Sequence, residues 1–191
     1  MKVLRAAGHK RMPWKNGGGE TVEIAISPEG AGLAEFDWRV STATVASDGP
    51  FSVFPGIDRT LSILEGKGMR LFIEGREQVL LTQESEPLGF AADIAVSATL
   101  PDGTITDLNV MTRRGTVRHA VARHFIDGKK SLAFAKGIFL VFCANGALAA
   151  RTGAQSIELD AGDALLLEES DGDRLDLSGQ ALCYAISIEK A

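Results

Sequence analysis

The sequence has few cysteines, few histidines and no long apolar run, and each shortage excludes a class of protein. The 191 residues include two cysteines and three histidines. No apolar stretch approaches the roughly 20 residues that a membrane-spanning helix needs. The first residues, MKVLRAAGHKRMPW, lack the apolar core of a secretory signal. We therefore expect a cytoplasmic protein that does not act at a membrane.

Basic residues are also too few for general nucleic-acid binding. Lys and Arg number 20 against 25 Asp and Glu, which gives a formal net charge of -5. Proteins that bind phosphate backbones carry surplus Lys and Arg, so nucleic acid is not an expected partner. The apolar content of 45% is that of a folded chain rather than a disordered one. The length suffices for one large domain or two small ones.

The two cysteines, Cys143 and Cys183, both lie in apolar, strand-like runs. Burial raises the pKa of a thiol, so neither is expected to be an activated nucleophile. One disulfide is an alternative, but reduced core thiols are the expectation for a cytoplasmic protein. The G-x-S-x-G motif of a serine nucleophile is also absent from the sequence.

The histidines have the wrong spacing for a metal site in a β-barrel. His119 and His124 are five residues apart, and His9 is far from both in sequence. Residues separated by an odd number on a strand face opposite sides, so this pair cannot both point into one barrel. We expect neither a bound metal nor an organic cofactor.

Glycine is abundant, and its positions favour an all-β fold. Twenty-one glycines recur between short apolar runs, as turns do between short strands. Residues 82–107 lack this regularity and predict a meandering connection. Residues 116–126 fit either a helix or a strand, and the β context favours a strand. The other expected strands are 21–27, 38–46, 59–64, 69–73, 78–81, 108–112, 138–144, 156–159, 164–168 and 181–188.

The two halves of the chain resemble each other in glycine spacing. Gly68 and Gly75 recur as Gly146 and Gly153, each 78 residues later. A duplicated strand–turn–strand–turn–strand unit explains this, although chance matching of glycines is an alternative. We expect two packed β-barrels in one chain, approximately 1–112 and 113–191. The run AGDALLL at 161–167 resembles the Gly-Asp turn of cupin-type barrels.

The glycine run NGGGET at 16–21 is the first candidate binding element. It lacks the spacing of a phosphate-binding loop and leads into an expected strand, so the helix N-terminus of such loops is missing. Three glycines exceed what a turn needs, which suggests a close approach of the backbone to something. A ligand contact and a plain turn both stay open.

The segment FSVFPGIDR at 51–59 combines an apolar wall with a charged pair. Phe51 and Phe54 supply the wall, and Asp58 and Arg59 stand where a strand begins. An Arg at a barrel mouth can bind a carboxylate through two parallel hydrogen bonds. The alternative is a surface ion pair between Asp58 and Arg59, which would contribute little to stability.

The segment DLNVMTRR at 107–114 predicts a polar strand face. Asp107, Asn109, Met111 and Arg113 are spaced by two and share one face. Three polar side chains beside one Met make a poor core and a good pocket wall. Within WRVS at 38–41, Arg39 and Ser41 show the same pattern.

Three long segments, MPWKNGGGET, WRVSTATVASDGPFSVFPGIDR and DLNVMTRR, closely resemble the HutD family, also called the HutD/Ves family. The resemblance implies a metal-free bicupin with two RmlC-like jelly rolls, located in the cytoplasm. It also implies a regulatory role in histidine utilisation through binding of a pathway metabolite such as urocanate or formylglutamate. The pocket residues it implies are Trp14, Lys15, Asn16, Phe54, Asp58, Arg59, Asn109 and Arg113.

We therefore expect a binding protein for a small carboxylate, with Arg59 and Lys15 as cationic anchors. The alternative is a metal-independent cupin enzyme acting on such a metabolite, in which Asp58 or Asp107 serves as general base. The adjacent Arg59 argues against Asp58 as the base, because it would lower the pKa of Asp58 and make it a weaker base. A third hypothesis is a protein that binds partners only through the outer faces of its barrels. The chain is also a possible homodimer.

Overall fold

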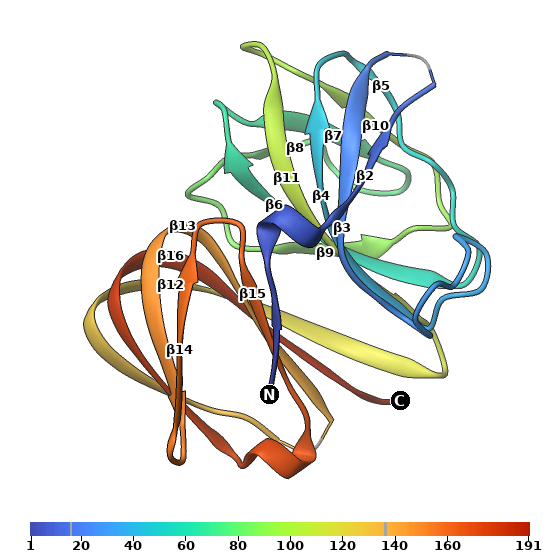
Figure 1. Cartoon of the computed structure of the whole chain (residues 1–191). Helices are drawn as coiled ribbons and strands as arrows, with labels where there is room; N and C mark the ends of the chain where they lie inside the picture. The colour runs from blue at the N-terminus through green and yellow to red at the C-terminus, as the bar shows by residue number, and fades with distance from the viewer. Residues whose placement is uncertain (16, 136) are drawn as a thin grey trace. The chain divides into compact units, whose positions relative to one another are not determined.

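The computed structural model describes residues 1–15, 17–135 and 137–191, and within them it contains strands and two short 3-10 turns but no α-helix (Figure 1). No helix of this described part is long and apolar enough to cross a membrane. The chain forms two compact units. The N-terminal unit is Lys10–Arg118 with Ala191, and the C-terminal unit is Met1–His9 with His119–Lys190. The predicted all-β class is confirmed.

The N-terminal unit contains a six-stranded and a four-stranded antiparallel sheet. In the larger sheet, the strands that begin at Trp38 and Ile57 lie on either side of the polar strand predicted near residue 108. In spatial order, the strands of the larger sheet are β2 (Lys10–Pro13), β3 (Gly19–Ser27), β4 (Trp38–Val45), β11 (Ile105–Arg113), β6 (Ile57–Glu65) and β9 (Leu88–Ala91). The strands of the smaller sheet, also in spatial order, are β5 (Gly49–Pro50), β10 (Val96–Thr99), β7 (Met69–Ile73) and β8 (Val79–Leu81).

The core of the N-terminal unit is built from alternate residues of both sheets. On β6, Leu61 and Ile63 are buried in the same apolar cluster as Leu71 of β7 and Val96 of β10. Residues two apart on a strand share a face, so the apolar alternation of each strand supplies one side of this cluster. Along β11, Met111 pairs with Arg59 of β6, which fixes the register of the polar segments.

The C-terminal unit is built on one six-stranded antiparallel sheet whose long strands curve strongly (Figure 1). Its apolar cluster takes residues from one face of these strands, including Val141, Leu165 and Leu177. The elements of this unit are β1 (Lys2–Leu4), η1 (Ala6–Gly8), β12 (Val117–Ala133, whose first two residues belong to the N-terminal unit), β13 (Ile138–Thr152), β14 (Gln155–Asp160), β15 (Ala164–Leu167), η2 (Glu169–Asp171) and β16 (Arg174–Lys190).

The first nine residues belong to the C-terminal unit, whereas the sequence assigned residues 1–112 to one barrel. Strand β1 pairs with β15, with Val3 opposite Leu165. In addition, Asp163 accepts hydrogen bonds from the Arg5 side chain and from the backbone N–H of Ala6. A three-residue strand carries too little pattern to reveal a partner about 160 residues away.

Two stretches that were hard to interpret in sequence are strands. The region expected to meander, 82–107, contains β9, β10 and the start of β11, because four-residue strands bounded by turns give almost no periodic signal. The ambiguous run at 116–126 lies on β12 from Val117 onward. The glycines of the proposed repeat take corresponding positions only in part. Gly68 lies in the turn between β6 and β7, whereas Gly146 lies inside β13 next to a register shift.

Candidate functional site

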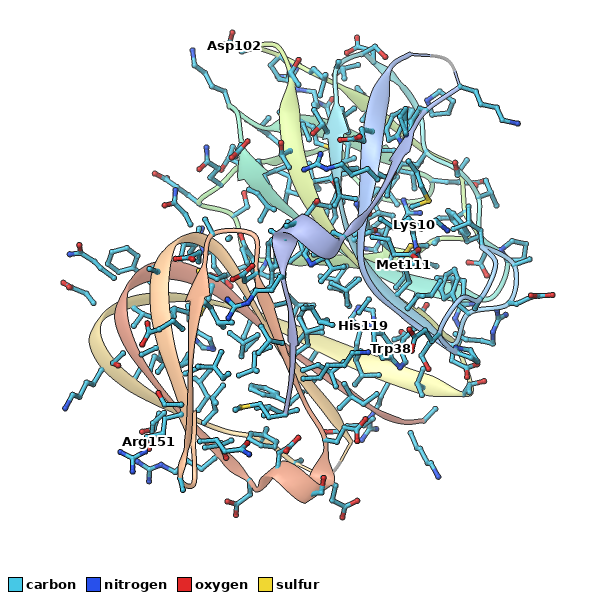
Figure 2. All side chains as sticks on the ribbon, in the orientation of Figure 1. Lys10, Trp38, Asp102, Met111, His119 and Arg151 are labelled. Atoms are coloured by element: carbon cyan, nitrogen blue, oxygen red, sulfur yellow. The ribbon has the colours of Figure 1, made fainter. Side chains whose placement is uncertain are left out.

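A cavity of about 710 Å³ lies in the N-terminal unit, bordered by β4, β6, β11 and the loops after β2 and β5. Its wall combines aromatic rings with buried charged groups. Met111, which is labelled in Figure 2, is one of its apolar lining residues and is 2% exposed. The volume is in the range of small-molecule sites.

Arg59 is the cation at the centre of this wall. It lies in the inward-facing row of β6 with Ile57, Leu61 and Ile63, and it is 6% exposed. Among the described residues, its Nε has no hydrogen-bond partner and no carboxylate lies within ion-pair distance. Burial lowers the pKa of Arg59 to about 10, and the field of Asp107 counteracts this in part. A buried guanidinium without an ion-pair partner is a site prepared for an anion.

Three phenylalanine rings surround the Arg59 guanidinium. Its Cζ lies 5.3 Å from the ring centroids of both Phe51 and Phe54, and 5.9 Å from that of Phe90. The negative faces of aromatic rings stabilise a cation at this range. The rings also exclude water, which strengthens any interaction that the guanidinium makes with a ligand.

Asp107 is the anion of the same cavity and is 1% exposed. Its Oδ1 accepts a hydrogen bond from the Nδ2 of Asn109, and the backbone N–H of Ala43 also donates to it. Burial raises the pKa of Asp107 to about 7, while Arg59 and the hydrogen bonds act in the opposite direction. This carboxyl group can therefore gain or lose a proton near neutral pH.

A second buried Arg in the wall is neutralised. Arg39 of β4 lies beside Glu23 of β3, with 2.7 Å between Nε and Oε2, and both side chains are largely buried. Their charges cancel, so this pair is part of the sheet structure. Arg59 is thus left as the buried cation without a partner among the described residues that line the cavity.

Gly19, the last glycine of the run, allows the close packing of Trp14. Trp14 lines the cavity, and its Nε1 donates a 2.8 Å hydrogen bond to Oγ1 of Thr21. A Cβ on Gly19 would lie 2.1 Å from the carbonyl oxygen of Thr44 and 3.0 Å from Cε3 of Trp14. The close approach anticipated from the glycines is therefore an approach to the indole ring and to β4.

The structure brings several of the residues predicted from sequence to this cavity. Arg59 and Asn109 come from adjacent strands, and Phe54 comes from the loop before β6. Trp14 and Lys15 come from the loop after β2. Asn16 lies outside the described residues.

Asp58 and Arg113 do not line the cavity. Asp58 accepts hydrogen bonds from Arg114, and both side chains are nearly half exposed. Consecutive residues of a strand face opposite sides, so Asp58 and Arg59 cannot enter the same pocket. Arg113 donates to the backbone carbonyls of Phe36 and Ala34 and thereby holds the loop before β4.

Sequence reasoning left out several lining residues. Arg39 and Ser41 line the cavity, although the sequence predicted no binding role for them. Their signal was a pair of polar residues two positions apart in a strand rich in β-branched residues. Asp107 was placed on the predicted pocket wall and considered as a base, but it was not among the predicted ligand-binding residues. Phe90 does not line the cavity itself, but it is the third ring around the Arg59 guanidinium; it lies in the stretch expected to be irregular, and no sequence signal pointed to it.

The described part of the chain contains no group of three or more His, Cys, Asp or Glu side chains placed to hold a metal ion. His119 and His124 both lie on β12.

The sequence model of the HutD family matches residues 6–185. The chain belongs to the HutD family. The membership expected from the three motifs is thus confirmed, and the match spans both units.

Relatives of this HutD-family chain support the assignment. It is 34% identical over 178 residues to an uncharacterized 21.2 kDa protein in the hutC 3' region of Pseudomonas putida. The aligned region covers 90% of this chain and 88% of that protein. It is 42% identical over 110 residues to protein Ves of Citrobacter koseri, covering 55% and 56% of the two chains.

Solved structures show the same fold. A conserved protein of unknown function from Pseudomonas aeruginosa matches with a TM-score of 0.92 and 34% identity, covering 99% of this chain and 98% of that one. HutD from Pseudomonas fluorescens matches with a TM-score of 0.84 and 31% identity over 100% and 98% of the chains. YhhW from Escherichia coli, at 7% identity and a TM-score of 0.70 over 100% and 98% of the chains, shares the fold alone. The HutD-family chain is a bicupin.

Proposed function

We propose that this chain is a metal-free binding protein for a small carboxylate metabolite, held in the cavity of the N-terminal unit. We further propose that it acts in the cytoplasm to regulate histidine utilisation, with urocanate and formylglutamate as the first ligands to test. The relatives named above, HutD of Pseudomonas fluorescens and the protein beside hutC, support this setting.

The observation that carries the proposal is the state of Arg59. A buried guanidinium that lacks a counter-ion is costly for the empty protein, and the carboxylate of a ligand removes that cost. Two parallel hydrogen bonds from the guanidinium would hold the carboxylate in one orientation. The surrounding Phe rings would keep water away from this contact.

The remaining groups of the wall would orient the rest of the ligand. Asn109 offers amide groups for hydrogen bonding, and Lys15 is an exposed cation where the cavity meets solvent. Trp14 would cover a planar or apolar part of the ligand. A sensor of metabolite level should bind with a Kd of micromolar to millimolar, or about 8 to 4 kcal/mol, which a few such contacts supply.

Thermal unfolding with a panel of carboxylates tests the proposal. A ligand at 100 times its Kd should stabilise the protein by about 2.7 kcal/mol. The panel contains urocanate, formylglutamate, their uncharged amides and formate. If no carboxylate shifts the melting temperature, or if the amides shift it equally, the proposal is wrong.

A metal-independent enzyme is the second candidate, and Asp107 is the observation that favours it. A carboxyl group with a pKa of about 7 in a cavity is suited to proton transfer. Asp58, the other base considered, lies outside the cavity. Proton NMR of each carboxylate incubated with pure protein separates the two functions, because an enzyme consumes its ligand or exchanges its protons with solvent, whereas a binding protein leaves it unchanged.

A further inference from the structure

The cavity contains opposite buried charges that are not paired with each other. Neither the carboxylate of Asp107 nor the guanidinium of Arg59 forms an ion pair with a described residue. Asp107 lies opposite Ile63 in the register of β11 with β6, and Arg59 lies opposite Met111. The two positions are thus four residues apart along the strands, which is roughly 13 Å of backbone. The two charges still lie within electrostatic range of each other, since each affects the pKa of the other.

The charged residues of the cavity wall determine whether a second anionic group on a ligand would be attracted or repelled. Arg39 is neutralised by Glu23. At the exposed edge, Lys15 and Asp48 carry opposite charges, and Asp48 accepts a hydrogen bond from the backbone N–H of Leu100. Arg59 therefore offers its charge to one anionic group, while any anion further along β11 approaches Asp107.

We propose that Asp107 is a specificity-determining residue that favours monocarboxylates with an uncharged hydrogen-bond donor at their far end over dicarboxylates such as formylglutamate. This inference rests on the proposed function, because Arg59 must first hold one carboxylate. An N–H or amide group of the ligand would donate to the ionised Asp107, whose Oδ1 already accepts from Asn109. A second carboxylate would be repelled at the same place.

Protonation of Asp107 relieves this repulsion, so dicarboxylate binding takes up a proton. The charged groups of the neighbouring elements are Arg59 on β6, Arg39 on β4 and Glu23 on β3, and Asn109 lies on the same strand. The pKa of Asp107 lies near 7, so a protein that binds a dicarboxylate only with this group neutral loses affinity as the pH rises above neutrality. The loss approaches tenfold per pH unit. A monocarboxylate with a donor group keeps its affinity over the same range.

N-formylglutamate and N-formylglutamine are the probes, because they have nearly the same shape and differ by one charge. Dissociation constants are measured by titration calorimetry between about pH 5.5 and 8.5, where both carboxylates of the diacid stay ionised. We expect N-formylglutamine to bind at least tenfold more tightly than N-formylglutamate at pH 8.5. This preference should shrink towards pH 5.5. Calorimetry in buffers of different ionisation enthalpy should show uptake of up to one proton with the diacid at pH 8.5. Equal binding at pH 8.5, or tighter binding of the diacid, overturns the inference.

Variants separate this inference from the proposed function. Asp107→Asn keeps an acceptor for Asn109 but removes the charge, so the diacid should bind without pH dependence and no longer be disfavoured. Asp58→Asn makes the same change outside the cavity and should leave the preference unaltered. Arg59→Met should abolish binding of both probes.

If Asp107→Asn retains the wild-type preference, the charge selection is wrong while carboxylate binding stands. If neither probe binds the wild-type protein, or if Arg59→Met binds both normally, the proposed function fails and this inference fails with it.

Discussion

Asp58 and Arg59 are consecutive in the chain, yet they serve opposite faces of strand β6. Arg59 lines the cavity and is 6% exposed, whereas Asp58 binds Arg114 and is nearly half exposed. The pair therefore does not neutralise itself, and Arg59 stays available to a ligand. Alternation along the strand, rather than proximity in sequence, decides which charge is functional.

Replacing Arg59 should stabilise the empty protein and abolish ligand binding. Arg59→Met removes a buried charge that lacks a counter-ion, and the Met side chain fills similar space among the Phe rings. We expect the free energy of unfolding to rise by about 1–3 kcal/mol, measured by urea denaturation. Thermal scans of the variant should show no shift with any carboxylate. A less stable variant would indicate that the rings and Asp107 already compensate the charge.

The stability of the protein should depend on pH through Asp107. Its pKa is raised from 3.8 to about 7 in the folded state, so between these values the folded protein holds a proton that the unfolded chain has released. Stability therefore falls as the pH rises from about 4 to about 7 and then levels off. Relative to Asp107→Asn, the wild type should lose at most roughly 4 kcal/mol over this range. Urea denaturation of both proteins at several pH values measures the difference, and parallel profiles would contradict it.

The packing of Gly19 against Trp14 predicts a strong effect of a single methyl group. Gly19→Ala places a Cβ against the backbone oxygen of Thr44 and the indole ring, so one of them must move. We expect a loss of about 1–3 kcal/mol in the free energy of unfolding and a changed emission spectrum of Trp14. Gly8→Ala is the matched control, because a Cβ there meets no atom within 4 Å. Similar stability of the two variants would refute the packing argument.

Trp14 should report ligand binding through its fluorescence. The chain has two tryptophans, and of these Trp14 lines the cavity, whereas Trp38 is 6% exposed and does not. Addition of a bound carboxylate should change the emission of the wild type and of Trp38→Phe. The change should disappear in Trp14→Phe. A ligand that binds by calorimetry without altering Trp14 emission would show that it occupies a different part of the protein.

The two cysteines should be free and unreactive in the folded protein. Cys143 and Cys183 face each other across β13 and β16, and both are fully buried. Burial raises the pKa of Cys143 to about 11 and that of Cys183 to about 12, so almost no thiolate exists at pH 8. A thiol reagent should label neither residue in the native protein and both after unfolding without reductant. Absence of labelling after unfolding would reveal a disulfide.

The sequence by itself determined the all-β class, most of the strands and the family. It also selected Trp14, Lys15, Phe54, Arg59 and Asn109, which all line the cavity. The all-β class and the strands were predictable because alternation with period two and glycine-rich turns are local properties, and Arg59 was noticeable because a charged residue within an apolar strand is visible in the same window.

Only the tertiary structure decided which polar residues meet. Arg113 belongs to the same face of β11 as Asn109 by spacing, yet the loop carbonyls of Ala34 and Phe36 engage it before it reaches the cavity. The pairing of Arg39 with Glu23, the isolation of Arg59 and the assignment of Met1–His9 to the C-terminal unit depend on contacts between distant segments. Periodicity tells which way a side chain faces, but its partner is fixed by strand order and register, which are set when the whole sheet assembles.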